Sequence, residues 1–429
     1  MKKIFAVLGT TALLGALAAA PAGATNGMDM IGYGTRSIGM GGADVAVAGD
    51  AGNVSGNPAA VSEAAPSSAN IGLTLLMPTM SLTHNTPSGP DSVDGEAQYF
   101  PMPQLGYVHR LGGGPVAVGI GLYAQGGMGV DFQGVNTGMG TKDELTSQVS
   151  FMRLNPLVSY KVNENVTLGG TLLVGYSQCN FSVYPGTYSA GADGKPGTGD
   201  DFAGMNIKGL NSLGFAGRIG AQVKLGPMVR LGAMYTSEST IKLDSGNAQL
   251  NFGQMKVNYD AELQDFTWPQ EAEAGVAVTP AKGLTVAFDV KWINWSKAID
   301  KPVLKISNPD QPVGMTSRDI TFDMAWKDQW VYAVGVEYAV NATNVLRAGY
   351  NYGKNPVPDA NLNPLFPATV EHHVTLGYGL TLGQWGVNLA YEHAFKNTQT
   401  NNNPENMFGP GLEVSHEQNT VSLDATYRY

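Results

Sequence analysis

The chain has 429 residues, of which 56 are glycine and only 14% are charged, and its formal net charge is -10. The acidic balance argues against nucleic acid as a partner, and a lone cysteine, Cys179, excludes an internal disulfide framework. After the first 24 residues no apolar run is long enough to cross a bilayer as a helix, so the length suits one large closed β structure.

Residues 1–24 have the pattern of a secretory signal peptide. A basic start, Lys2-Lys3, precedes an apolar run from Ile4 to about Ala20. The small residues Ala22-Gly23-Ala24 then form the expected cleavage site. We therefore expect an exported chain whose mature part begins at Thr25.

From residue 67 onward the dominant pattern is a period of two. Val421 to Tyr429 alternates apolar with polar residues to the end of the chain, and Val286 to Trp292 and Trp385 to Glu392 do the same. The apolar face of such a strand points inward in a soluble sandwich, whereas in a membrane barrel it points to lipid. The alternation alone leaves both architectures open.

The lengths of the connections separate these two cases. Six tight turns are expected near 112–114, 163–165, 226–227, 280–283, 341–343 and 383–384. They alternate with seven longer polar segments near 85–96, 132–144, 184–207, 246–261, 299–328, 355–369 and 398–412. Short turns on one side and long loops on the other are typical of outer-membrane barrels rather than of sandwiches. We predict an all-β transmembrane antiparallel barrel of about fourteen strands, whose longer strands carry the wall above the membrane.

The stretch between the signal peptide and the first strand is rich in glycine and alanine and matches neither a strand nor one long helix. Within it, Asn57 is a good N-cap and Pro58 suits a first helical turn, so a short helix is expected from Asn57 to Ala64. The turn count puts both ends of the barrel on the periplasmic side, from which this stretch can fold back into the lumen. We therefore divide the chain into a signal peptide (1–24), an N-terminal hatch that plugs the lumen (25–66) and a barrel (67–429).

The segment DAGNVSGNPA, which contains Asp50 and Asn57, resembles the corresponding part of the FadL-type long-chain fatty acid transporters of the Gram-negative outer membrane. The resemblance continues in order through VRLGAMYTSESTIKLDSGN (229–247), WPQE (268–271), WINWS (292–296), WKD (326–328), NPVP (355–358) and the closing YRY (427–429). It covers nearly the whole mature chain. It implies a fourteen-stranded barrel with a hatch, located in the outer membrane and surrounded by its lipid, that passes hydrophobic molecules inward without energy input; we expect a monomer.

The resemblance also implies a transport route. Ligand is captured among the outer loops, moves to a pocket against the hatch and leaves sideways where the third strand is kinked. Here that strand is expected from Val116 to Phe132, with Gln125, Gly126 and Gly127 in its middle, where paired glycines fit either a lateral opening or an ordinary bulge. We expect the hatch to gate this opening, with residues around Asn57, Pro58 and Ala59 in contact with it and Asp50 in the same motif.

A fatty acid needs an apolar slot and a cation for its carboxylate. The candidate cations are Arg36, Arg153, Arg218 and Lys327, of which Arg153 and Lys327 are our choice, and the candidate apolar residues are Met128, Met139, Leu365, Phe366, Met407 and Phe408, of which Met128, Phe366 and Phe408 are our choice. Members of the family often have arginine before the twelfth strand, where this chain has Glu371-His372-His373. The departure leaves the carboxylate site open, so aromatic or aliphatic hydrocarbons stand beside fatty acids as the expected cargo.

Three other functions stay open on the residues alone: a general porin, a barrel-embedded lipid hydrolase, and a structural or adhesive role. No serine–histidine–acid arrangement is recognisable, so we expect no catalytic residue and no enzyme activity. The six histidines show no metal spacing, and we expect no cofactor and no metal site. Calcium in the acidic loop 191–201 remains an alternative there.

Overall fold

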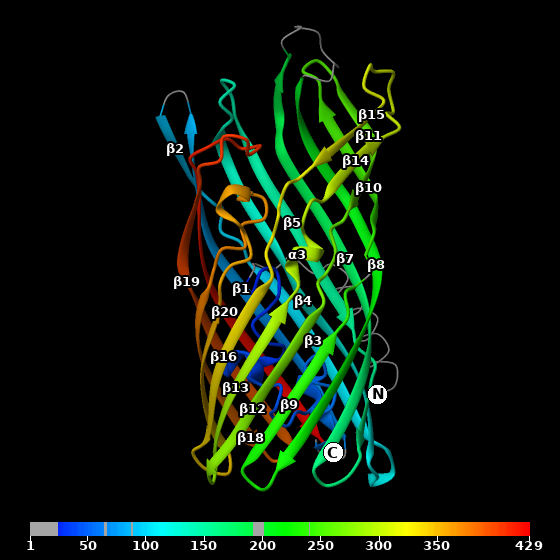
Figure 1. Cartoon of the computed structure of the whole chain (residues 1–429), viewed down its shortest axis with the longest axis vertical. Helices are drawn as coiled ribbons and strands as arrows, with labels where there is room; N and C mark the ends of the chain where they lie inside the picture. Colours follow the sequence, from blue (N-terminus) through cyan, green and yellow to red (C-terminus); the bar gives the residue numbers. More distant parts are fainter. Residues whose placement is uncertain (1–24, 64–66, 87–88, 192–200, 240) are drawn as a thin grey trace.

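We analysed a computed structural model of the chain, which describes residues 25–63, 67–86, 89–191, 201–239 and 241–429. The expected signal peptide and residues 192–200 of the acidic loop lie outside the described residues. The described strands form one continuous sheet that closes into a tall barrel (Figure 1). Among the described residues, no helix is long and apolar enough to cross a membrane.

The strands in chain order are β1 (Ser67–Thr86), β2 (Gly89–Asp94), β3 (Phe100–Arg110), β4 (Val116–Asn136), β5 (Lys142–Leu154), β6 (Leu157–Lys161), β7 (Val166–Ser189), β8 (Phe202–Leu225), β9 (Val229–Thr236), β10 (Leu243–Asn251), β11 (Lys256–Gln264), β12 (Glu271–Ala281), β13 (Leu284–Ile293), β14 (Val303–Ser307), β15 (Ser317–Thr321), β16 (Gln329–Ala339), β17 (Asn344–Gly353), β18 (His372–Leu382), β19 (Trp385–Asn401) and β20 (Leu412–Arg428). The helical pieces are short: α2 (Thr35–Gly39), η1 (Ala51–Asn53), η2 (Ala60–Glu63), η3 (Leu111–Gly113), α3 (Trp295–Ala298) and η4 (Asp359–Asn361).

Antiparallel pairing runs around the barrel from β1 through β3, β4, β5 with β6, β7, β8, β9, β12, β13, β16, β17, β18, β19 and β20. β5 and β6 both pair with β4 and β7, so together they form the fourth barrel strand. β20 closes the ring on β1, from the pair Ser68–Arg428 to the pair Thr83–Glu413. The prediction of a fourteen-stranded barrel is confirmed.

All six predicted tight turns join consecutive barrel strands at one end of the molecule (Figure 1). Three of the predicted long loops are not irregular segments: 85–96 contains β2, 246–261 contains most of β10 and β11, and 299–328 contains β14 and β15. These five strands extend the wall: β2 pairs with β1, β10 pairs with β8 and β11, and β14 pairs with β11 and β15. Their polar composition is compatible with a strand wherever the outer face of the wall is in water rather than in lipid.

The last strand, β20, shows which face points to lipid. Leu423 is 53% exposed, whereas its neighbours Ser422 and Asp424 are 0% and 3% exposed. The apolar face is therefore outside and the polar face lines the lumen, as in a membrane barrel and opposite to a soluble sandwich. The same outward apolar face is formed by residues that include Ile71, Leu73, Ile120, Leu168, Leu172, Phe215, Ile219, Phe288, Trp330, Tyr332, Leu346, Leu376 and Leu389.

This polarity inverts along the strands. On the outer face of β20, apolar Val421 and Leu423 give way to polar Asn419 and Glu417 further up. On the inner face the order is reversed, since Asp424 lies low and the buried, apolar Val414 lies high. The lower barrel is thus apolar outside and polar inside, and the upper barrel is polar outside and apolar inside, which is the distribution expected of a wall that rises above the membrane.

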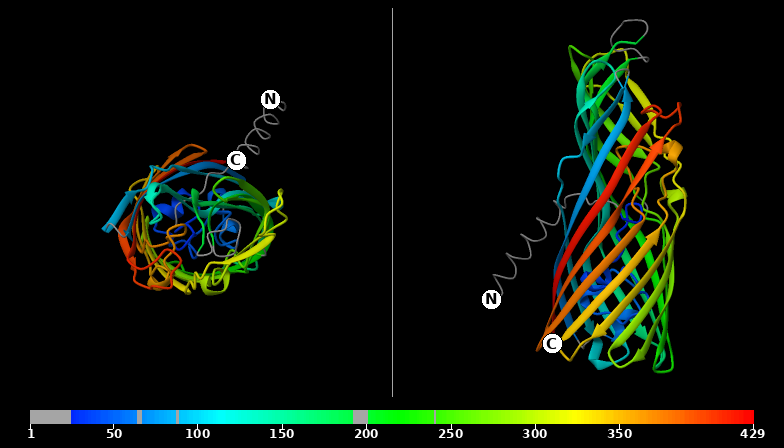
Figure 2. Two further views of the ribbon diagram at one scale, coloured as in Figure 1. Left: turned by 90° about the horizontal axis from the view of Figure 1, so that it is seen from above. Right: turned by 90° about the vertical axis from the view of Figure 1, so that its left-hand side faces the viewer.

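Residues 25–63, here called the lumen segment, lie inside the lower barrel, where Figure 2 shows them enclosed by the ring of strands. The wall carries glycines where the backbone of the lumen segment comes close. A β-carbon on Gly106 would lie 1.8 Å from the Ala51 carbonyl oxygen, and one on Gly232 would lie 2.1 Å from that of Val45. Similar approaches occur at Gly126, Gly169, Gly220, Gly335, Gly349 and Gly377. The abundance of glycine thus reflects a close fit between segment and wall.

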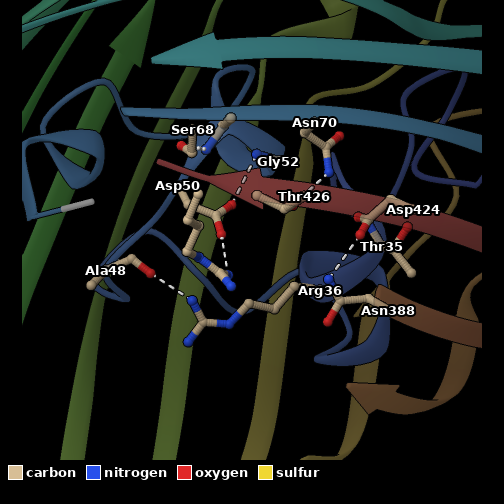
Figure 3. A network of polar contacts seen from close by, with 12 residues as sticks. Thr35, Arg36, Ala48, Asp50, Gly52, Ser68, Asn70, Asn388, Asp424 and Thr426 are labelled. Atoms are coloured by element: carbon tan, nitrogen blue, oxygen red, sulfur yellow. Dashed lines mark hydrogen bonds and ion pairs between the residues drawn. The ribbon is translucent and has the colours of Figure 1, made fainter. Parts of the chain in front are cut away.

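Polar contacts fix the lower part of the lumen segment to strands at the seam of the barrel (Figure 3). Asp50 accepts hydrogen bonds from its own loop at Gly52 and from Arg428 of β20. The Thr35 amide donates to Asp424, while Arg36 donates to the Ala48 carbonyl. Arg36 also forms a bidentate ion pair with Glu337 of β16, in which Nη2 donates to Oε1 at 2.7 Å and Nε donates to Oε2 at 2.8 Å.

The helix predicted from Asn57 to Ala64 begins later than expected, and its predicted last residue lies outside the described residues. Asn57 does cap a turn, because its Oδ1 accepts from the Ala59 amide at 3.0 Å. The helical conformation itself is η2, a 3-10 helix from Ala60 to Glu63. Asn57 is also anchored by its Nδ2, which donates to the Val45 carbonyl within the lumen segment and to the Ala221 carbonyl of β8 in the wall.

Candidate functional site

A chain of buried aromatic rings lies above the start of the lumen segment. The ring centroids of Phe151 and Trp268 are 4.5 Å apart, those of Trp268 and Trp295 are 6.1 Å apart, and those of Trp295 and Trp326 are 5.3 Å apart. The two tryptophan pairs are edge-to-face, which is a favourable arrangement for aromatic rings. The rings come from β5 and from the connections around β12, β13 and β16, so distant parts of the sequence converge here.

The connection between β17 and β18 closes this aromatic cluster from above. Phe366 lies 6.4 Å from Phe181 and 5.9 Å from Phe266, measured between ring centroids. The neighbouring residue Leu365 is fully buried, and its carbonyl accepts a hydrogen bond from Ser147 of β5. The cluster is therefore tightly packed, and a ligand that enters it must displace part of this loop.

Arg153 of β5 lies at the lower edge of the aromatic cluster and is fully buried. Its guanidinium carbon is 4.8 Å from the centroid of the Phe151 ring. Nη2 donates to Ser239 Oγ at 3.0 Å, whereas Nε and Nη1 have no hydrogen-bond partner among the described residues. Two unpaired donors on a buried guanidinium are energetically costly, and such a group is well suited to bind a carboxylate.

The structure brings together several of the residues chosen from the sequence. Met128 and Phe366 belong to the apolar core that contains the aromatic cluster, and Phe408 packs against that core. Arg153 touches the same core through Phe151. Lys327 does not join them: it is exposed, with its backbone amide on the Pro356 carbonyl.

The other residues weighed for this site have different surroundings. Met139 and Met407 are exposed. Arg36 is paired with Glu337, and Arg218 donates to the carbonyls of Ser55 and Gly56 in the lumen segment.

The sequence analysis did not assign Trp268, Trp295 and Trp326 to the site. Each of them stands in one of the tryptophan motifs that carry the family resemblance. Their presence in these shared motifs was the sequence signal that could have identified them as site residues. Tyr123 of β4 is a further lumen residue that was not chosen from the sequence. It faces the lumen and donates to the Ala51 carbonyl at 3.0 Å.

A gap in the wall lies between β3 and β4. The two strands pair from Arg110–Ala117 only as far as Gln104–Tyr123, and the backbone contact resumes higher up, at Gly95–Phe132. β4 is also bulged between Ala124 and Gly126 on the side of β5. The sequence signal on the facing strand is Pro101-Met102-Pro103, because a proline has no amide hydrogen to donate to a neighbouring strand.

The start of the lumen segment covers this gap from inside. Asp29 forms a β-bridge with Gly126, and the Gly127 amide donates to the Met28 carbonyl at 3.0 Å. The Gln125 side chain donates to Asp29 Oδ1 at 3.2 Å. The predicted opening residues are thus in direct contact with the lumen segment.

The expectation that Asn57, Pro58 and Ala59 make this contact is wrong. Their described wall contacts are with β6, β7, β8 and β9, including the hydrogen bond from Ser159 to the Ala59 carbonyl and the close approaches of Gly169 to Pro58 and of Gly220 to Asn57. The reason is the path of the chain, which places residues 26–29 at β4 and reaches the other side of the lumen by Asn57.

A polar groove of about 600 Å³ lies beside the gap. It is lined by side chains of β4, β5, β7 and β8 together with Gln98 and Phe100, and includes Asp131, Gln148 and Asn180. Its polar lining distinguishes it from the aromatic cluster, so we do not assign the ligand site to this groove.

The closed fourteen-stranded ring, the lipid-facing apolar belt and the filled lumen define an outer-membrane β-barrel protein. The chain belongs to the outer membrane protein transport protein family (OMPP1/FadL/TodX), whose family model matches residues 15–429. No curated protein matches the chain.

Solved structures with the same fold include three transporters or homologues. The toluene transporter TodX of Pseudomonas putida superposes with a TM-score of 0.77 at 22% identity, covering 94% of this chain and 100% of TodX. The toluene transporter TbuX of Ralstonia pickettii gives 0.72 at 20% identity, covering 93% and 99%. A FadL homologue of Pseudomonas aeruginosa gives 0.73 at 17% identity, covering 94% and 99%. At these identities the likeness establishes the fold alone.

Proposed function

We propose that this protein is a passive channel that takes hydrophobic molecules across the outer membrane, and that its cargo is long-chain fatty acids. The observation that carries the choice of an acid is Arg153, a buried cation with two unpaired donors at the edge of an apolar, aromatic cluster. An acyl chain would pack among the aromatic rings while the carboxylate accepts from one of the two unpaired nitrogens of Arg153, Nε or Nη1. A hydrogen bond from a guanidinium to a carboxylate is strong because it is charge-assisted.

The second candidate cargo is an aromatic hydrocarbon. The edge-to-face series Trp268, Trp295 and Trp326 offers ring faces and edges to an aromatic guest without any need for a charge. The toluene transporters among the solved structures have the same fold, which supports this candidate by analogy only. The two candidates differ in one respect, namely whether Arg153 is used.

The proposed route follows the inversion of polarity. Molecules are captured among the outer loops, where Phe408 borders the apolar core, and enter the aromatic cluster when the loop around Phe366 moves. They leave through the β3–β4 gap after the lumen segment has moved away from Gly126 and Gly127. In this proposal residues 1–24 are a cleaved signal peptide, residues 25–66 act as the hatch, and residues 67–429 form a barrel that works as a monomer in outer-membrane lipid.

The test compares the purified protein with the variants Arg153→Met and Lys327→Met. Arg153→Met keeps an apolar side chain of similar length at the cluster, while Lys327→Met removes an exposed cation. Binding of oleate and of toluene is measured for all three proteins by calorimetry. We expect Arg153→Met to lose about 1.5 to 3 kcal/mol of oleate affinity, as for a hydrogen-bonded charge, and to retain toluene affinity, with Lys327→Met unchanged for both.

Equal oleate affinity in the wild type and Arg153→Met would reject the acid site, and toluene binding alone would favour the hydrocarbon channel. Mass spectrometry of molecules that co-purify with the barrel gives an independent answer. Free passage of sugars into liposomes would support a general porin, and ester hydrolysis lost on replacing one serine or histidine would support an embedded hydrolase.

A further inference from the structure

Three carboxylates meet in the lower lumen, away from the aromatic cluster. Asp44 belongs to the lumen segment, Glu273 to β12 and Asp289 to β13. One oxygen of each lies within 4.8 Å of the oxygens of the other two. None of the three forms an ion pair with another described residue. The arrangement concentrates negative charge where segment and wall meet.

The backbone around the cluster holds these side chains in place. Asp289 Oδ2 accepts a hydrogen bond from the Val45 amide at 2.8 Å, while its Oδ1 has no partner in the described part of the chain. Gly275, which pairs with Asp289 across the strands, leaves room for that oxygen, because a β-carbon there would lie 1.8 Å from Oδ1. Asp44 Oδ2 accepts from Asn53 Nδ2 at 3.2 Å.

A small cavity of about 20 Å³ lies among these residues. A cavity of this size holds one water molecule or one ion rather than a hydrated cluster. Asn351 of β17 lines the same cavity and is fully buried. Its Nδ2 donates to the Gly41 carbonyl at 3.0 Å, but its Oδ1 has no partner among the described residues. This unpaired amide oxygen is an observation independent of the three acids.

The basic residues nearby are engaged elsewhere. Lys291 also lines the cavity, but its Nζ lies 2.8 Å from Asp29 and 3.5 Å from Glu271, two further carboxylates. Arg218 donates to Thr236 and to carbonyls of the lumen segment. Of the five buried or half-buried carboxyl groups in this region, Asp29 and Glu271 are paired with Lys291, whereas Asp44, Glu273 and Asp289 have no ion pair among the described residues.

We propose that Asp44, Glu273, Asp289 and the amide oxygen of Asn351 form a binding site for one divalent cation of the size of Ca²⁺. Hard oxygen ligands, three of them charged, are those that Ca²⁺ takes in proteins. Mg²⁺ fits less well, because it usually keeps several water molecules, for which the cavity has no room. The site escapes sequence analysis because its ligands are scattered from position 44 to position 351.

The cation would fasten the lumen segment to the wall. Asp44 is contributed by the segment, whereas Glu273, Asp289 and Asn351 come from three strands of the barrel. Binding therefore crosslinks the two parts, and removal of the ion leaves carboxylates that repel one another across the junction. The external concentration of divalent cations would then set how readily the segment moves.

The test uses the full-length mature barrel, purified free of lipopolysaccharide and stripped with a chelator. Calorimetry with Ca²⁺, and electron paramagnetic resonance with Mn²⁺ as a probe that Ca²⁺ displaces, measure the stoichiometry and affinity. We expect one ion per chain in the wild type, and affinity at least about tenfold weaker in Asp289→Asn and in Glu273→Gln, since each removes one charged ligand. The matched control is Glu392→Gln, a buried carboxylate facing the lumen from β19.

A second measurement requires no variant. Hydrogen exchange of residues 41–47 is compared in the wild type between a sample with Ca²⁺ and a sample with chelator. We expect Ca²⁺ to slow exchange there. The proposal is overturned if no saturable binding occurs at about 10 mM Ca²⁺, above the range of the weakest extracellular calcium modules. It is equally overturned if both cluster variants bind as tightly as the wild type, or if exchange is unaffected.

Discussion

Gly126 of β4 lies directly against the carbonyl oxygen of Met28: a β-carbon on Gly126 would be 2.1 Å from that oxygen. The lumen segment can therefore reach the wall gap only because position 126 has no side chain. This contact ties the two features that the proposed transport route depends on, the opening in β4 and the segment that covers it.

We predict that Gly126→Val displaces the start of the lumen segment from β4. The methyl groups would occupy the position of the Met28 carbonyl, and the hydrogen bond from the Gly127 amide to Met28 would be lost. Hydrogen exchange at residues 125–128 should accelerate, and conductance in planar bilayers should rise. The control is Gly217→Val on β8, where an added β-carbon has open space. Unchanged exchange in Gly126→Val would show that the segment does not depend on this approach.

Removing the cation of Lys291 should destabilise the barrel strongly. Lys291→Met leaves Asp29 and Glu271 buried without their partner, which typically costs about 3–5 kcal/mol. Lys161→Met, which breaks the exposed pair with Glu164, should cost only about 0–1 kcal/mol. Urea unfolding in lipid vesicles measures both. Similar costs for the two variants would mean that water reaches Lys291 freely.

The boundary of the lipid-facing belt on β20 can be measured with arginine. Leu423→Arg places a charge in the apolar belt and should destabilise the barrel by about 2–4 kcal/mol. Glu417→Arg lies on the same outer face but above the inversion of polarity, so its cost should be about 0–1 kcal/mol, as near an interface. Unfolding titrations in vesicles give both values. A large cost for Glu417→Arg would put the boundary higher than we infer.

Protonation of Asp328 at low pH should loosen residues 292–299. Burial raises the pKa of this carboxyl, but hydrogen bonds from Ser296, Asn294 and Trp292 outweigh burial and hold the pKa below its ordinary value. A lowered folded-state pKa means that the stabilisation is fully present above the unfolded value of about 3.9 and is lost as pH falls through the folded value.

Protection of residues 292–299 from hydrogen exchange, corrected for intrinsic rates, should therefore be constant from neutral pH down to about 4, near the unfolded value, and decrease below it. Asp328→Asn has no such carboxyl, so its protection should be lower and independent of pH. A pH step of the same size in Asp328→Asn would assign the effect to another group.

Much of the barrel can be predicted from the sequence, because strands and tight turns are recognisable from residues that are consecutive in the chain. A strand such as β20 displays its two faces in consecutive residues, and each tight turn stands between two such strands. The count of fourteen strands follows from these local patterns. β2, β10, β11, β14 and β15 were missed because a strand with water outside it needs no apolar outer face.

The sites could not be predicted in the same way, because closure of the barrel brings their residues together. Phe151 and Trp326 are far apart in sequence but belong to one aromatic chain. Arg153 could be selected as an inward-facing cation, yet its unpaired nitrogens depend on what surrounds it. The path of the lumen segment was also unpredictable, since nothing local to Asn57 tells which strands it will meet.

The inversion of polarity has a consequence for how oily solutes partition. Gly126 pairs with Phe151, which in turn pairs with Ser177 of β7, and Ser177 lies between Tyr176 and Gln178, where the outer face of β7 turns from apolar to polar. The gap in the wall is thus level with the point where the apolar interior of the upper barrel ends and the apolar exterior of the lower barrel begins. On the proposed route, a solute that prefers oil to water would pass from one phase to the other at this level with little exposure to water, and its concentration gradient would set the direction of flow.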